Sequence, residues 1–350
     1  MTIRPADGPH QVPGRSSAHV LGVGAAVVAG AGSAVQSRVN GSLADAVGSG
    51  FLAAVVSFGS GLVVLAVALF AWPRARAALR RIPAALRPGD RAPRLQWWQC
   101  VGGAAGGFFV AAQGLTVGSL GVAVFIVAIV AGQSVTSLVV DRLGLAPGGK
   151  RPVTLGRALG PALTVVAVLI SVAGSLRTPD AIGLAVLPLL AGAGSAWQQA
   201  VNGRVRGVAS GVAGDPRGGA APGVLAATFL NFLVGTVALL LAYGVSVLVA
   251  GPPTGSFPTN PWLYTGGVIG IVFIGTAAAV VHRIGVLLLG LGLIAGQIVG
   301  ALVLDLVTPG AAAPAATTYV GAALTLVAVA VPAVVGAALA RRHAGGRVGA

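Results

Sequence analysis

The chain has 350 residues, of which 56% are hydrophobic and only 8% are charged, and its mean hydropathy is +0.92. A soluble domain carries roughly one-quarter charged residues, so this composition excludes an ordinary soluble protein and indicates a polytopic membrane protein. The net charge of +15 lies in loops between apolar segments, not in a basic stripe with base-stacking aromatic residues, which excludes nucleic-acid binding.

The polar segment 1–19 is predicted to be a disordered cytoplasmic tail. The apolar run from Val20, followed by small residues at 29–34, looks like a secretory signal peptide with its cleavage site. However, AGAGSAVQSRVNG at 29–41 returns in the middle of the chain as AGAGSAWQQAVNG at 191–203, with ten of thirteen positions identical. No signal peptide can lie there, so we expect an uncleaved first span and an internal duplication.

Ten apolar segments follow one another along the chain, each close to the length that a membrane-spanning helix needs. They are 20–39, 51–72, 97–117, 120–140, 158–176, 182–201, 224–249, 262–281, 284–304 and 319–340. The stretch 73–96 is predicted to be a loop that carries seven arginines. We expect two repeats, 20–176 and 177–340, between cytoplasmic tails at 1–19 and 341–350.

The two halves match beyond the opening motif. At a constant offset of 164 residues the coinciding pairs include Trp98 and Trp262, Gly121 and Gly285, Gln133 and Gln297, and Asp141 and Asp305. Each half therefore holds five predicted spans.

The basic residues predict the orientation, because Lys and Arg gather in cytoplasmic loops. With the N-terminus in the cytoplasm, only Arg38 and Arg177 fall on the outer side. Five is an odd number, so the second repeat crosses the membrane in the opposite sense to the first. The predicted fold is therefore an all-α integral membrane protein of ten transmembrane helices in two inverted five-helix repeats, which is typical of secondary transporters.

Three sets of motifs resemble those of the drug/metabolite transporter superfamily, most closely its YdcZ-like branch of bacterial inner-membrane proteins. They are AGAGSAVQSRVNG with its copy, WWQCVGG at 97–103, and AGQSVTSLVVD at 131–141 with AGQIVGALVLD at 295–305. The resemblance covers nearly all of 20–340. It implies that spans 1, 3, 4, 6, 8 and 9 surround a central cavity, that spans 5 and 10 are peripheral, and that the protein transports small metabolites or toxic compounds.

Gln133 and Gln297 are the first candidates for a solute site, because an amide inside a span is costly unless it faces protein or a cavity. Gln133 shares a helix face with Ser137 and Asp141, and Gln297 shares one with Asp305. Hydrogen bonding between helices would explain both glutamines equally well. Small-xxx-small glycine ridges, such as Gly292, Gly296 and Gly300, predict close helix packing.

Further candidates lie in the repeated motif and in spans 3 and 7. Gln36 and Gln198 are weighed equally as solute contacts and as helix-terminal groups, whereas Asn40 and Asn202, each followed by glycine, are expected to end their helices. Gln113 has Ala277 at the equivalent position of the other repeat, and Asn231 has Ser57. These two positions therefore differ between the repeats. An asymmetric solute and drift after duplication both account for this difference.

Three titratable residues are candidates for coupling or gating. Asp141 is expected to form an interfacial ion pair with Arg142. Asp305, at the outer end of span 9, is the first candidate for a protonatable or gating group, and His282, at the inner end of span 8, could titrate near neutral pH. For Asp305 and His282 a solvated loop position is the simpler interpretation.

These features favour a secondary transporter or exporter of neutral or zwitterionic polar molecules by alternating access, with a non-transporting scaffold or regulator as the alternative. An enzyme is not expected, because no buried catalytic constellation is evident. A single cysteine, Cys100, excludes an intramolecular disulfide and a cysteine-cluster metal site, and we expect no cofactor and no metal. The expected partners are a small-molecule solute and the lipid bilayer, with a homodimer as an open alternative.

Overall fold

The computed structural model describes residues 14–87, 94–145, 149–150, 152–153, 155–173, 179–211, 219–307 and 315–328, without the side chains of 14–19, 155–157, 171–173, 179–182 and 277–291. Within these ranges the chain is helical and contains no strand. The helices are α1 (Gly14–Val47), α2 (Gly50–Ala71), α3 (Pro73–Leu86), α4 (Gly102–Leu143), α5 (Leu155–Ala173), α6 (Pro179–Ser210), α7 (Ala220–Ala250) and α8 (Gly266–Val307), with single 3-10 turns at Trp97–Gln99 and Pro261–Tyr264. A further helix covers 316–328.

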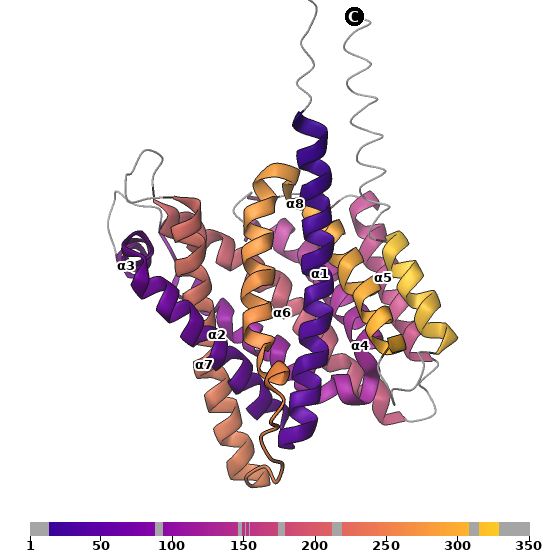
Figure 1. Cartoon of the computed structure of the whole chain (residues 1–350). Helices are drawn as coiled ribbons and strands as arrows, with labels where there is room; N and C mark the ends of the chain where they lie inside the picture. The colour runs from indigo at the N-terminus through magenta and orange to yellow at the C-terminus, as the bar shows by residue number, and fades with distance from the viewer. Residues whose placement is uncertain are drawn as a thin grey trace, which may run out of the picture.

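Most of the long helices stand upright in Figure 1. Four described segments are long and apolar enough to cross a bilayer, namely Val20–Val47, Gly50–Ala71, Trp97–Leu143 and Ala220–Ala250. Shorter apolar helices lie at Ala158–Ile170, Gly266–Thr276, Gly292–Val307 and Ala316–Ala328. The protein is thus an all-helical integral membrane protein, as the sequence predicts.

The helix α4 contains two spans joined by a single glycine. Its 42 residues would extend about 60 Å as one straight helix, twice the thickness of a bilayer's apolar core. Gly121 interrupts it with φ 77° and ψ 161°, in a region that L side chains avoid. Spans 3 and 4 of the prediction are therefore the two halves of α4, and α8, also of 42 residues, holds the equivalent spans of the second repeat.

The two repeats pack against each other through equivalent contacts. In α1 and α8, a Cβ at Gly30 would overlap the carbonyl oxygen of Leu293, and one at Gly296 would overlap that of Val27. The same contacts recur between α6 and α4, at Gly192 with Ile129 and at Gly132 with Leu189. The first helix of each repeat thus lies directly on the fourth span of the other repeat, and the predicted glycine ridges are the surfaces that permit it.

The centre of the apolar core is the first half of the second span of α4. Every residue from Val122 to Ala131 is buried there, against Ile298 and Ala301 of α8, Ala167 of α5, Ala191 of α6 and Ala322 of the last described helix. The helices α5 and 316–328 flank this core on one side of the molecule (Figure 1). Their lipid-facing side chains, such as Leu159, Leu169 and Val320, are exposed.

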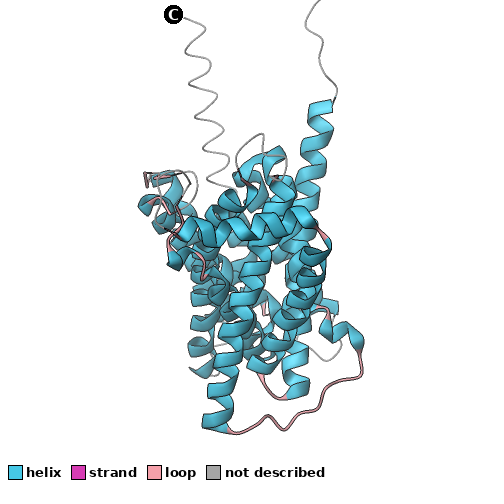
Figure 2. Cartoon of the chain, turned by 90° about the vertical axis from the view of Figure 1, so that its left-hand side faces the viewer, coloured by secondary structure: helices cyan, strands magenta, loops and turns pink. Residues whose placement is uncertain are grey.

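The predicted loop at 73–96 is wrong for its first half, because Pro73–Leu86 forms the amphipathic helix α3. Ala75, Ala78, Ile82 and Ala85 recur every three or four residues and are buried. Ala78, Ile82 and Ala85 pack with Val205 and Ala209 of α6 and with Ala226 and Ala227 of α7. The loop was predicted from the clustered arginines, and these stand between the apolar positions that have the spacing of a helix. α3 lies crosswise at one end of the upright helices (Figures 1 and 2).

The expected helix ends at Asn40 and Asn202 are also wrong. α1 continues to Val47 and α6 to Ser210, so both asparagines lie inside their helices. An Asn-Gly pair ends a helix where water can satisfy the freed backbone, but here the glycine is used for close packing. A Cβ at Gly41 would lie 2.9 Å from the Val117 Cγ1 atom, and the Asn40 amide finds a partner on α4.

Candidate functional site

Buried amide and hydroxyl groups join α1 to the first span of α4. The Asn40 Nδ2 atom donates to the Gln113 Oε1 atom at 2.6 Å, and the Gln113 Nε2 atom donates to the Ser37 Oγ atom at 2.9 Å. Ser37 in turn donates to the carbonyl of Ser33 at 3.0 Å. All three side chains that connect the two helices are buried. Gln113, which has alanine as its counterpart in the second repeat, thus joins α4 to α1.

A second group of polar atoms surrounds the start of α8. The Gln36 Nε2 atom donates to the carbonyl of Gly266 at 2.8 Å. A Cβ at Gly266 would meet the side-chain oxygens of Asn40 and Ser57, and one at Gly270 would meet the Gln36 amide. The Asn40 Oδ1 and Ser57 Oγ atoms are buried without a hydrogen-bond partner in the described structure. Such atoms need water or a solute.

The second repeat builds the equivalent group at the start of α4. The Gln198 Nε2 atom donates to the Asn231 Oδ1 atom at 3.0 Å, and both side chains lie against Gly106. Asn202 lies beside Gly102, as Asn40 lies beside Gly266. The Asn231 Nδ2 atom is buried without a described partner. The structure therefore brings Gln198 and Asn231 together, two residues that no local pattern links.

The two span glutamines have different surroundings. The Gln133 Nε2 atom donates to the Ser195 Oγ atom of α6 at 3.0 Å, and Gln133 is half-buried. Gln297 is only 4% exposed, and its Oε1 atom has no partner among the described residues. Ser195 was not predicted as a site residue, although it belongs to the repeated AGAGSA motif, where its counterpart is Ser33.

Asp305 is a buried helix cap, and the interpretation as a solvated loop residue is wrong. Its side chain accepts hydrogen bonds from the backbone N–H groups of Val122 at 3.1 Å and Ala123 at 2.8 Å, and it is 7% exposed. These are the first amides after the break at Gly121, which have no partner inside the helix. The carboxylate thus stabilises the second span of α4 from the end of α8. The signal that could have found this is the paired retention of Gly121 with Gly285 and of Asp141 with Asp305.

Exposure of the polar helix faces differs sharply between the two ends of the molecule. On α4, Gln133, Ser134 and Asp141 are half-buried and Ser137 is exposed, on the side of the helix away from the exposed Val135 and Val139. Their counterparts on α8 (Gln297, Ile298, Ala301 and Asp305) are all buried. On the first helices, Gln199 of α6 is exposed while its counterpart Ser37 of α1 is 0% exposed. These positions are therefore exposed or half-buried at one end of the bundle, called the open end, and buried at the other, called the closed end.

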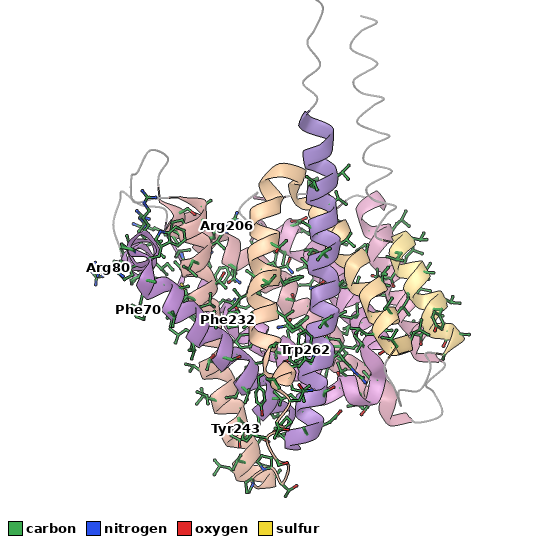
Figure 3. All side chains as sticks on the ribbon, in the orientation of Figure 1. Phe70, Arg80, Arg206, Phe232, Tyr243 and Trp262 are labelled. Atoms are coloured by element: carbon green, nitrogen blue, oxygen red, sulfur yellow. The ribbon has the colours of Figure 1, made fainter. Side chains whose placement is uncertain are left out.

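The open end is the one that carries most of the basic residues. Arg80 and Arg206 lie toward it, and Tyr243 and Trp262 lie toward the other end (Figure 3). Arg204 of α6 donates to the carbonyls of Gly144 at 2.7 Å and Leu145 at 2.6 Å, which follow the last turn of α4. Asp141 is half-buried in that turn, and its ion pair with Arg142 stays a prediction. His282 lies in α8, and its side chain is outside the described part of the chain.

The comparison with known families covers most of the chain. A family model described as "Putative inner membrane exporter, YdcZ" matches it twice, at residues 21–170 and 183–331. The chain belongs to the YdcZ family of the drug/metabolite transporters. No curated protein and no solved structure gives a significant match.

Membership of the YdcZ family agrees with the structure in two respects. The family model matches once in each repeat, and the helices of the two repeats make equivalent contacts through Gly30 with Leu293 and Gly192 with Ile129. As a member of this family the protein is an inner-membrane protein of the transporter class. The family does not name a solute, so the chemistry of the site has to be argued from the side chains that line it.

Proposed function

We propose that this YdcZ-family protein is a secondary exporter that moves small neutral or zwitterionic polar solutes by alternating access. The observation that carries the proposal is the unequal exposure of equivalent faces in two inverted repeats. Ser137 is exposed while its counterpart Ala301 is 0% exposed. Two repeats that could exchange these environments would expose one central site to either side of the membrane in turn.

The state described here would be the inward-open one. The basic residues support an orientation with the open end, the N-terminus and the C-terminus in the cytoplasm. The outer gate would then consist of the Asn40, Gln113 and Ser37 hydrogen bonds together with the Asp305 cap on Val122 and Ala123. The first set of bonds joins two helices of the first repeat, and the Asp305 cap joins the second repeat to the first.

The proposed solute site lies where the open face meets the buried amides. Gln133 with Ser195, and Gln198 with Asn231, present amide and hydroxyl groups from α4, α6 and α7. Among the described residues, the Asn231 Nδ2 atom is a donor without a partner and the Gln297 Oε1 atom is an acceptor without one. Groups of this kind fit hydroxyl, amide or zwitterionic solutes better than strongly charged ions, because they carry no net charge to pair with one.

Asp305 is the residue that we propose holds the outer gate closed. As a carboxylate it offers only acceptors, and it uses one oxygen for each backbone N–H. Loss of the carboxylate would leave both amides of α4 without their acceptor. Opening of the outer gate would then be easier, since the break at Gly121 already separates the two spans of α4.

Flux measurements in proteoliposomes test the transport proposal. Purified protein should move at least one member of a panel of labelled neutral amino acids, amides and sugars across the bilayer. Gln133→Ala should slow that flux roughly two- to tenfold, the effect of one lost hydrogen bond. Thr259→Ala, which changes an exposed threonine in the loop between α7 and α8, should leave it unchanged. If no member of the panel is transported or bound, the scaffold or regulatory alternative is favoured.

A further inference from the structure

The exposed side of α3 is strongly basic. Arg74, Arg80 and Arg87 are exposed, and Arg76 and Arg81 are half-buried. The opposite side of the helix is held to the bundle by buried apolar side chains, and Arg81 donates to the carbonyl of Ala209 of α6 at 3.0 Å. The basic side therefore has a fixed orientation toward the surroundings of the protein.

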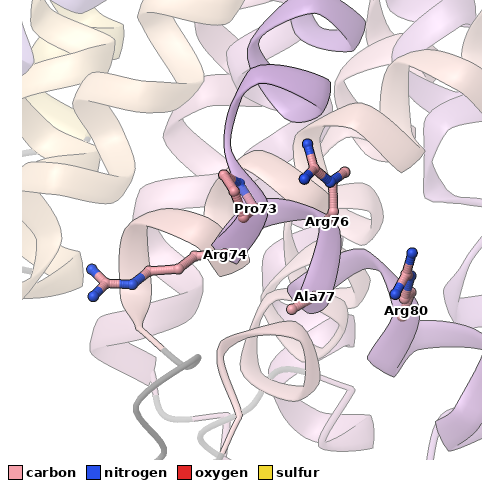
Figure 4. A pocket seen from close by; sticks show the side chains of 5 residues that line it. All are labelled: Pro73, Arg74, Arg76, Ala77 and Arg80. Atoms are coloured by element: carbon pink, nitrogen blue, oxygen red, sulfur yellow. The ribbon is translucent and has the colours of Figure 1, made fainter.

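A shallow cavity of about 340 Å³ lies at the start of α3. Its lining consists of Pro73, Arg74, Arg76, Ala77 and Arg80, which Figure 4 shows along the first turns of the helix. Arg76 also donates to the carbonyl of Phe70, which fixes it at the junction with α2. No acidic side chain lines the cavity. Arg74 and Arg76 lie in the first turn of α3 and Arg80 one turn further on, and their guanidinium groups extend in different directions around the cavity (Figure 4). Together they give this surface a positive charge that suits an anion.

The position of this cavity matches the headgroup layer of a bilayer. α2 is apolar up to Ala71, and Trp72 follows it with 37% exposure, as expected of an interfacial anchor. α3 then turns crosswise to the spans (Figures 1 and 2), in the manner of an amphipathic helix that lies in the plane of the membrane surface. The arginines are thus held where the apolar core of the bilayer ends and the lipid phosphates begin.

We propose that the cavity formed by Arg74, Arg76 and Arg80 binds the phosphate headgroup of an anionic phospholipid. Guanidinium groups pair with phosphate oxygens through two parallel N–H donors. The positive charge of the site and the lack of acidic side chains in its lining favour this occupant over a neutral lipid. Bound lipid would tie α3, and through it the cytoplasmic ends of α6 and α7, to the membrane surface.

The test measures lipid binding to the full-length protein in detergent by native mass spectrometry, with phosphatidylglycerol and phosphatidylcholine as probes. Arg74→Gln/Arg80→Gln should weaken phosphatidylglycerol binding roughly thirtyfold, because each arginine near an anionic lipid contributes about a factor of five. The matched control, Arg142→Gln/Lys150→Gln, removes two exposed charges elsewhere and should keep binding near the wild-type level. Equal loss in both variants, or no loss in either, would overturn the proposal.

Two further arms separate charge from folding and lipid from free phosphate. Arg74→Lys/Arg80→Lys keeps both charges and should retain most of the binding, whereas a loss as large as that of the glutamine variant would indicate a structural role and contradict the proposal. Inorganic phosphate at millimolar concentration should not displace phosphatidylglycerol. Displacement would identify the cavity as a site for free phosphate and overturn the assignment to lipid.

Discussion

Phe58 and Phe232 occupy equivalent positions in α2 and α7 and stack on each other, with ring centroids 4.7 Å apart and an interplanar angle of 25°. Gly61 and Gly235, which are also equivalent, admit the ring of the opposite repeat. A pair of equivalent residues that touch must lie on the axis relating the repeats. Their chain neighbours Ser57 and Asn231 belong to the two polar groups, so the stack holds the two halves of the candidate site together.

Removal of either ring should destabilise the protein to a similar extent. Phe58→Ala or Phe232→Ala empties a buried aromatic position, for which a loss of about 3 kcal/mol is typical. Thermal unfolding in detergent checks the effect. Phe70→Ala removes a ring that is 63% exposed and should cost far less. A large effect at only one of the two stacked positions would show that the repeats do not share the contact.

A methyl group at Gly30 should separate α1 from α8. Gly30→Ala places a Cβ where the Leu293 carbonyl lies, and backbone cannot yield as a flexible side chain does. We expect a loss of more than about 1 kcal/mol of stability, since overpacking of a tight contact typically costs that much. Gly24→Ala is the matched control in the same helix, because nothing lies within 4 Å of its Cβ.

That control should be neutral or slightly stabilising, because alanine favours a helix over glycine. Thermal stability of the two variants in one detergent gives a direct comparison. If Gly30→Ala were tolerated as well as Gly24→Ala, the close approach of α1 to α8 would not exist in the membrane.

The architecture could be predicted from the sequence because its signals are local or repeated. Apolar length gives the spans, and the constant offset between Gln133 and Gln297 gives the repeats. The glycine ridges were recognisable for the same reason. The contacts of the candidate site could not be predicted in this way, since Asp305 caps amides that lie 182 and 183 residues earlier in the chain. Nothing local to Asp305 indicates that its partner is backbone.

The errors at Asn40 and α3 have one physical origin. Turn and loop signals such as Asn-Gly and clustered arginine assume that water surrounds the segment. In this bundle Gln113 replaces water as the partner of Asn40, and the apolar face of α3 packs on α6 and α7. In both cases the burial of side chains against neighbouring helices outweighs the local preference for a turn or loop. The sequence of one chain does not show which segments are buried in this way.

Cysteine labelling should distinguish the two ends of the bundle. In a Cys100→Ser background, Ser137→Cys should react with a membrane-impermeant maleimide added to inside-out vesicles, because Ser137 is exposed at the open end. Ala301→Cys, at the equivalent position, should resist the reagent added to right-side-out cells, because Ala301 is 0% exposed. The opposite pattern would reverse the proposed orientation, and equal reactivity would contradict the closed outer gate.

Loss of the Asp305 carboxylate should open the outer gate. Asp305→Ala leaves the Val122 and Ala123 amides without their acceptor, and removal of a helix cap typically costs about 1 kcal/mol, equivalent to a roughly fivefold change in a conformational equilibrium. Thr116→Cys is a suitable reporter in the Cys100→Ser background, since Thr116 is 0% exposed in the first span of α4. Its labelling from the outside should rise several-fold when Asp305→Ala is added.

Two variants serve as controls for this effect. Asp305→Asn keeps one acceptor oxygen and should give a smaller increase in labelling. Asp45→Asn, at an exposed aspartate near the outer end of α1, should give none. If Asp305→Ala lowered the thermal stability but left outside labelling unchanged, Asp305 would be a structural cap of α4 and not part of a gate.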